Sequence, residues 1–186
     1  MAATHDPVLH ALIEAAVGGT GGTDGWILAV RGEQLEVAAA TGPLAASVLG
    51  VTIPGGAGTA GFVVASGQPI ALAPHAGDPR AAEGMASVTG REPASLLCVP
   101  CESDDGVTGA LEVVDKAGGG AFTFDDVELA TLLAGVAGIA LAGGRAAQTS
   151  APDPSELAGE LRRLAESQPA RYAAVATVVA ALLSNG

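Results

Sequence analysis

The sequence is poor in cysteine, in positive charge and in long apolar runs, and each shortage excludes a class of protein. Two cysteines among 186 residues are too few for a disulfide-stabilised secreted scaffold. Eight Lys and Arg against 20 Asp and Glu give a formal charge of −12, which argues against nucleic-acid backbones and anionic membranes as partners. The apolar, uncharged run at residues 129–144 is shorter than the roughly 20 residues of a membrane span. With no signal-peptide pattern in MAATHDPVLH, we expect a cytoplasmic protein.

A predicted β-hairpin at residues 95–116 (SLLCVPCESDDGVTGALEVVDK) forms the centre of the sequence. Its two apolar runs flank an Asp-Gly pair, which is a strong hairpin signal because glycine tolerates positive φ. The first run, 96–101, is apolar on both faces and predicts a central strand that is covered on both sides. The second run alternates, so the face that carries Thr108 and Glu112 is expected to be wetter than the other.

Further elements are predicted on both sides of the hairpin. Before the hairpin they are a helix that Asp6 caps at Pro7, strands at 25–32, 34–41 and 69–72, and a short helix that Gly67 ends. A connection at 74–93, with one helical stretch around 79–85, leads into the hairpin. After the hairpin, a helix begins at a Thr123/Asp126 capping box and ends at Gly143-Gly144. Long connections in compact domains are usually functional lids or mobile. We call residues 74–93 the lid.

Gly56, Gly58 and Gly61 match the G-x-G-x-x-G pattern of dinucleotide-binding turns. Such a turn needs an uninterrupted strand before it and a long helix after it. Here Pro54 interrupts the strand, and Gly67 ends the helix after barely two turns. We therefore expect a tight turn into a short helix whose glycines allow close packing.

Cys98 and Cys101 form a C-x-x-C pattern, but inside a predicted strand. Redox-active pairs of this kind lie at a helix start, whereas residues three apart in a strand point to opposite faces. Zinc would need more ligands, and His5, His10 and His75 have no matching spacing. We interpret both cysteines as buried apolar residues and expect no metal site.

The order of these motifs resembles a GAF domain, from about Val8 to Leu141. The matching segments are the glycine turn at 56–61, S-G-Q-P-I at 66–70, D-P-R at 78–80, S-L-L-x-V-P at 95–100, G-A-L-E-V-V-D-K at 109–116 and F-T-x-D-D at 122–126. The resemblance implies an α+β fold similar to PAS domains, with an antiparallel sheet, helices on one face and a lidded pocket on the other. It also implies small-molecule sensing, commonly of cyclic nucleotides, bilins or haem, and dimerisation through flanking helices.

The sequence departs from the cyclic-nucleotide members of this family. They carry an asparagine–lysine pair followed by phenylalanine, aspartate and glutamate. Lys116, Phe122 and Asp126 match, but Asp115 replaces the asparagine and Val127 the glutamate. We expect Lys116 and Asp126 to form a structural salt bridge that braces the loop.

The lid also lacks the groups that other ligands and one enzyme activity need. Bilin members attach their pigment through a lid cysteine, which is absent here, and His75 is the sole candidate for an axial haem ligand. The free methionine-(R)-sulfoxide reductases, a GAF-like enzyme group, place a catalytic cysteine just before the strand matching 95–100. This chain has Ser87, Thr89 and Ser95 in that region.

Six residues in or beside the lid form the candidate ligand-binding set: His75, Asp78, Arg80, Met85, Arg91 and Ser95. Either arginine would suit an anionic group. The alternative for Asp78-Pro79-Arg80 is a capped turn with a surface arginine. The spacing predicts no Ser-His-Asp or paired-carboxylate arrangement.

The GAF-like domain is predicted to span residues 1–145. A linker at 146–154 and a C-terminal helical hairpin at 155–186 are predicted to follow it. Leu157, Leu161 and Leu164 form a narrow seam typical of a short coiled coil. The last helix, 171–183, is apolar nearly all round and must be covered by protein. We expect a homodimer.

From these patterns we expect a non-enzymatic sensory or regulatory module. It would bind a small molecule, with its cofactor unspecified, and act through a protein partner or the dimer. Two alternatives stay open. One is a structural or interaction protein with a filled pocket, and the other is an enzyme similar to the methionine sulfoxide reductases.

Overall fold

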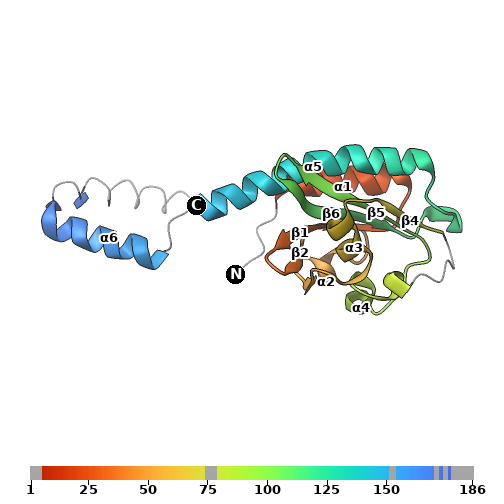
Figure 1. Cartoon of the computed structure of the whole chain (residues 1–186), viewed down its shortest axis with the longest axis horizontal. Helices are drawn as coiled ribbons and strands as arrows, with labels where there is room; N and C mark the ends of the chain where they lie inside the picture. The colour runs from red at the N-terminus through yellow and green to blue at the C-terminus, as the bar shows by residue number, and fades with distance from the viewer. Residues whose placement is uncertain (1–5, 74–78, 151–153, 170–171, 174–175, 177–186) are drawn as a thin grey trace. The chain divides into compact units, whose positions relative to one another are not determined.

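The computed structural model describes residues 6–73, 79–150, 154–169, 172–173 and 176 (Figure 1). The chain divides into two compact units, residues 1–144 and 145–186, which are described separately below.

In the described part of the first unit, six strands form one antiparallel sheet of order β3-β2-β1-β6-β5-β4. The strands are β1 (Asp24–Arg31), β2 (Gln34–Thr41), β3 (Thr52–Pro54), β4 (Ile70–Leu72), β5 (Leu96–Ser103) and β6 (Gly106–Val114). The helices are α1 (Pro7–Thr20), α2 (Ala45–Val48), α3 (Gly58–Ser66), α4 (Met85–Thr89) and α5 (Phe124–Ser150), with short 3-10 turns η1 (Pro79–Ala82) and η2 (Ala117–Gly119). This architecture confirms the α+β prediction.

Local capping signals set where the helices begin. The Asp6 carboxylate accepts hydrogen bonds from the backbone N–H groups of Val8 and Leu9, at 2.9 and 3.3 Å. Thr123 and Asp126 form the predicted capping box at the start of α5, since each side chain bonds the other residue's backbone N–H, at 3.3 and 2.6 Å. Both helix starts therefore follow from residues next to them in sequence.

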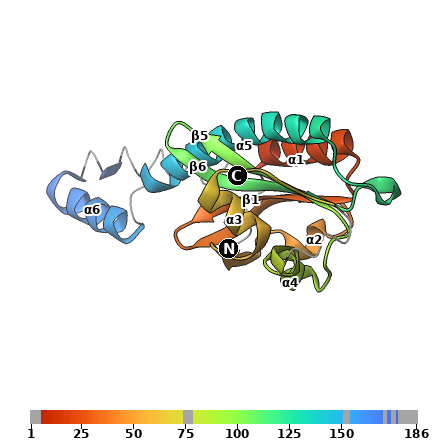
Figure 2. The ribbon, with the colours of Figure 1, turned by 45° about the vertical axis from the view of Figure 1, so that its right-hand side comes forward.

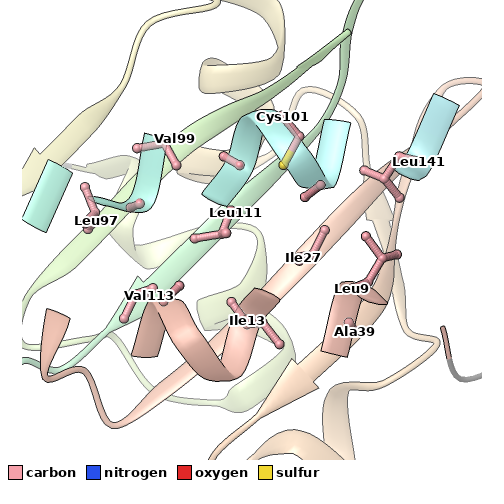
Figure 3. Packing of buried hydrophobic residues seen from close by; sticks show 14 of the residues in the cluster. Leu9, Ile13, Ile27, Ala39, Leu97, Val99, Cys101, Leu111, Val113 and Leu141 are labelled. Atoms are coloured by element: carbon pink, nitrogen blue, oxygen red, sulfur yellow. The ribbon is translucent and has the colours of Figure 1, made fainter. Parts of the chain in front are cut away.

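Helices cover both faces of the sheet (Figures 1 and 2). On one face, α1 and α5 pack over a core that includes Ile13, Ile27, Val99, Leu111 and Val113 (Figure 3). On the other face, α2, α3 and α4 cover a second core. That core includes Trp26, Leu28, Val63, Met85 and Leu96.

The hairpin prediction is confirmed, but two details of it are wrong. Strand β5 is buried on both faces, as expected, yet it lies next to the edge strand β4, and the centre of the sheet is formed by β1 and β6. The supposedly wetter face of β6 is dry, because Thr108 and Glu112 are only 3% and 2% exposed. Strand alternation cannot reveal this burial, since the covering elements come from distant segments.

Helix α5 packs closely on β5 and runs further than predicted. A Cβ at Gly138 would overlap the backbone of Glu102, so only glycine fits at this crossing. Gly143 and Gly144 do not end the helix, because neither has the positive φ of a helix C-cap, and α5 continues to Ser150. Part of the predicted linker is therefore helical.

The stretch Phe124–Gly144 of α5 has the length and hydropathy of a membrane span, with a mean hydropathy of 1.7. Its Ala130, Ala134, Ala137 and Leu141 nevertheless pack into the core on the sheet. This stretch is thus a core helix of the domain, with one side left exposed.

In the second unit, α6 spans Pro154–Ser167 and coincides with the first helix of the predicted C-terminal hairpin. The second predicted helix, 171–183, lies almost entirely outside the described residues.

Candidate functional site

A small pocket lies between the sheet and the lid, on the face that α2, α3 and α4 cover. Strands and α3 supply its inner residues, and the lid supplies Met85, Thr89 and Arg91. Its volume is about 10 Å³, which is room for roughly one water molecule. The pocket predicted from the family resemblance therefore exists here, in a nearly closed form.

The polar centre of this pocket is Glu112, on the central strand β6. It lies opposite Trp26 of β1 and Cys98 of β5 in the register of the sheet. Trp26 Nε1–H donates a hydrogen bond to Glu112 Oε1 at 3.0 Å, and Thr59 Oγ1 lies 2.8 Å from Oε2. Each carboxyl oxygen thus has at least one partner, which offsets much of the free-energy cost of burying the group.

Burial raises the pKa of Glu112, and the hydrogen bonds from Thr59, Trp26 and Cys98 lower it only in part. Among the ion pairs of the described residues, none includes Glu112. The charged form of the carboxyl therefore has hydrogen-bond donors around it but no countercharge. A neutral, protonated Glu112 is favoured over a wider pH range than for an exposed glutamate.

Glycines let the lid pack directly on the start of α3. Gly58 has a φ of +67°, and a Cβ there would approach the carbonyl oxygen of Glu83 to 3.0 Å. A Cβ at Gly84 would lie 3.1 Å from the carbonyl oxygen of Ala57. The G-x-G-x-x-G motif thus serves close backbone packing, as predicted, and it holds the lid over the pocket.

Asp115 ties the end of the lid to the end of β6. Its Oδ1 accepts a hydrogen bond from the backbone N–H of Ala94 at 2.7 Å, and its Oδ2 lies 2.5 Å from Nη1 of Arg91. Asp115 has a positive φ of 55°, which is uncommon for a residue other than glycine and suits its tight position after the strand. We call the Arg91–Asp115 pair the lid latch.

The six candidate ligand-binding residues do not lie together in the structure. Met85, which is 4% exposed, and Arg91 line the pocket. Arg80 instead stacks on Phe62 of α3, with its guanidinium carbon 4.4 Å from the ring centroid. Ser95 is buried beside the latch, where its Oγ accepts a hydrogen bond from the backbone N–H of Lys116 at 3.0 Å. His75 and Asp78 lie outside the described residues.

Lys116 and Asp126 form an ion pair away from the pocket. Asp126 Oδ2 also accepts hydrogen bonds from Thr123, at 2.6 Å to its N and 2.9 Å to its Oγ1. Burial raises the pKa of Asp126, but the hydrogen bonds from Lys116 and Thr123 outweigh burial and hold it below the usual range. The pair joins η2 and the start of α5.

Both cysteines are fully buried, and they face opposite sides of the sheet, as predicted. Cys98 belongs to the core beside the pocket and Cys101 to the core under α5. Burial raises the pKa of Cys101 to about 12, and burial together with the nearby Glu112 raises that of Cys98. Neither thiol is poised to form a thiolate. In the described residues, no cluster of three or more His, Cys, Asp or Glu could hold a metal ion.

The candidate set from the sequence did not include the residues that make the inner part of the pocket polar, namely Trp26, Thr59 and Glu112. One signal for Glu112 was available, because it is the single acidic residue in an otherwise apolar or small strand, 107–114. Thr59 and Trp26 carry no comparable signal, since they join Glu112 only through the tertiary fold.

Replacing Glu112 with Gln should change how stability depends on pH. Above the ordinary glutamate pKa of 4.5, the folded protein holds more protons at Glu112 than the unfolded chain does. The free energy of unfolding of the wild type should therefore fall, relative to that of Glu112→Gln, by up to about 1.4 kcal/mol per pH unit as pH rises from 4.5 to the raised pKa.

Urea unfolding at a series of pH values measures this difference. Glu102→Gln, at an exposed position on the neighbouring strand β5, is the matched control and should track the wild type. A pH-independent difference between Glu112→Gln and the wild type would contradict the raised pKa.

Comparison with known proteins supports the same fold. Residues 6–141 match the family model of the GAF domain. The GAF-B domain of DevS from Mycobacterium smegmatis is 21% identical, with a TM-score of 0.59 over 77% of this chain and 97% of that chain. The GAF domain of a phosphoenolpyruvate-protein phosphotransferase from Coxiella burnetii is 16% identical, with a TM-score of 0.66 over 79% and 90%.

The free methionine-R-sulfoxide reductase from Neisseria meningitidis, solved in complex with its substrate, is 23% identical, with a TM-score of 0.57 over 77% of this chain and 82% of that chain. No curated protein matches the sequence. These identities establish a shared fold rather than a shared activity. Because the family model covers most of the first unit, the chain belongs to the GAF domain family.

Proposed function

We propose that this chain is a non-enzymatic regulatory module, cytoplasmic in location, that binds a small molecule between the sheet and the lid. The observation that carries the proposal is the buried Glu112 at the inner end of the pocket. Trp26 and Thr59 hold this polar group among apolar walls. Ligand sites usually have this composition, with a few placed polar groups in a mostly apolar lining.

Binding in this pocket would be coupled to movement of the lid. At about 10 Å³ the pocket holds no molecule much larger than water, so a ligand must displace lid residues such as Met85. The latch from Arg91 to Asp115 is half exposed on the arginine side, so solvent can replace it at little cost. A ligand that binds only the open lid would shift the lid population, which is the basis of a sensor.

Other chemistry has less support in this chain. Thiol catalysis would need an accessible thiolate, whereas both cysteines are buried. The motif shared with cyclic-nucleotide members, Lys116 and Asp126, forms an internal ion pair and does not line the pocket.

The closed pocket also supports a second candidate function. If Met85 and its neighbours fill the site permanently, the domain would serve assembly rather than sensing. The small volume favours this alternative, and the polar Glu112 disfavours it, because an apolar residue would fill a purely structural core more stably.

A screen of ligand classes separates the two functions. Nucleotides, haem, amino acids, acyl compounds and small amines would each be tested for a concentration-dependent rise in the melting temperature. The regulatory function predicts stabilisation by one class, reaching about 2.7 kcal/mol at 100 times its Kd. Saturating binding that Met85→Trp abolishes would place the ligand under the lid. No stabilisation by any class would contradict ligand sensing and favour assembly.

The output of the module is proposed to pass through a homodimer formed by α5. Leu132, Val136 and Ile139 are 72%, 50% and 68% exposed, and their spacing of four and three residues puts them in one stripe. This spacing is that of a coiled-coil seam, which a second copy of the same helix can cover.

Leu132→Glu should therefore weaken self-association, because it places a charge in the seam. Thr131→Glu is the matched control, since it adds the same charge at an exposed position about 100° around the helix. Sedimentation velocity at tens of micromolar should show a dimer for the wild type and the control, and a monomer for Leu132→Glu. A wild-type monomer, or a dimer that Leu132→Glu leaves intact, would contradict the proposal.

A further inference from the structure

The pocket contains a buried carboxyl group with no paired cation, and this arrangement points to a class of ligand. Glu112 is 2% exposed, and the described residues pair it with no cation. The nearest strand partners are the Trp26 indole and the Cys98 thiol, and neither can supply a positive charge at neutral pH. The site thus offers a buried acceptor whose charged form lacks a countercharge.

We infer that the pocket selects a small ligand with a cationic ammonium head on a short apolar body, and that Glu112 accepts the head. This inference rests on the proposed function and adds the ligand class to it. Trp26, Thr59 and Cys98 use three of the roughly four lone-pair sites of the carboxylate, so it has room for one further donor.

The walls around Glu112 define the rest of the ligand. Trp26, Met85, Leu96 and Val114 line the pocket, and all four are apolar over most of their surface. They would bury a short hydrocarbon chain or ring, and removing its apolar surface from water favours binding. An anionic head in the same place would be repelled by the ionised form of Glu112 and could not act as its countercharge.

Binding of an ammonium group would also be linked to protons. A cation beside Glu112 favours its ionised form, so the carboxyl proton would leave to solvent as the ligand binds. Affinity should therefore fall as pH is lowered and protonation of Glu112 competes with the ligand. The other titratable groups that line or adjoin the pocket, among described residues, are Glu83 and Arg91 from the lid and Cys98 from β5.

Trp26 provides a direct reporter, because it is the one tryptophan in the chain and its indole N–H bonds Glu112. The single indole ¹H–¹⁵N resonance can be followed while butylamine, 1-butanol or butyrate is added to the full chain at pH 7. These probes share a four-carbon chain and differ in the charge of the head.

We expect a saturable shift with butylamine, an affinity at least about tenfold lower for 1-butanol, and no binding of butyrate. Glu112→Gln should remove the preference for the amine over the alcohol. The matched control is Glu102→Gln, which removes an exposed carboxylate of β5 that does not line the pocket and should keep the preference.

The wild type alone also tests the inference, so the result does not depend on folding of Glu112→Gln. The affinity for butylamine should fall between pH 7 and pH 5 more steeply than the affinity for 1-butanol. Equal binding of amine and alcohol, or tighter binding of butyrate, would overturn the ligand class while leaving the regulatory function in place. Binding of none of the three probes at millimolar concentration would overturn the ligand class, and the wider screen of ligand classes would then decide the function.

Discussion

Glu112 lies on one of the two central strands of the sheet, and its carboxyl group is shielded from solvent by α3 and the lid. A charged residue type in this position would destabilise an ordinary core by several kcal/mol if it had no partners. Trp26 and Thr59 supply those partners from β1 and α3, so the fold brings three distant segments together around one polar group. The position of the pocket, its closed form and its expected ligand class all depend on this arrangement.

The lid is held over Glu112 by two kinds of contact with different strengths. The backbone packing of Glu83 and Gly84 on the start of α3 is tight and requires glycine at Gly58. The latch between Arg91 and Asp115 is more exposed and therefore weaker. This contrast suits a lid that moves at its latched end while Glu83 and Gly84 stay packed on the start of α3.

Much of the fold could be predicted because its signals are local. The Asp6 cap, the Thr123/Asp126 capping box and the Asp-Gly hairpin each depend on neighbouring residues, and all three are present. The burial of Glu112 and the long course of α5 could not be predicted in the same way. Whether β6 has a wet face depends on α3 and the lid, and Gly143-Gly144 ends a helix only if the backbone there adopts positive φ. Of the candidate site residues, Met85 and Arg91 line the pocket, whereas Arg80 and Ser95 do not.

The ionisation of Glu112 in the folded protein is the most direct test of this account. The ¹³C resonance of its side-chain carboxyl carbon, identified by its loss in Glu112→Gln, can be followed by NMR from pH 3 to pH 9. If the carboxyl group is buried as described, this resonance should titrate at a higher pH than the ordinary glutamate pKa of 4.5. A Glu112 resonance that titrates at or below pH 4.5 would show a solvated carboxyl group and contradict the raised pKa on which the pocket chemistry depends.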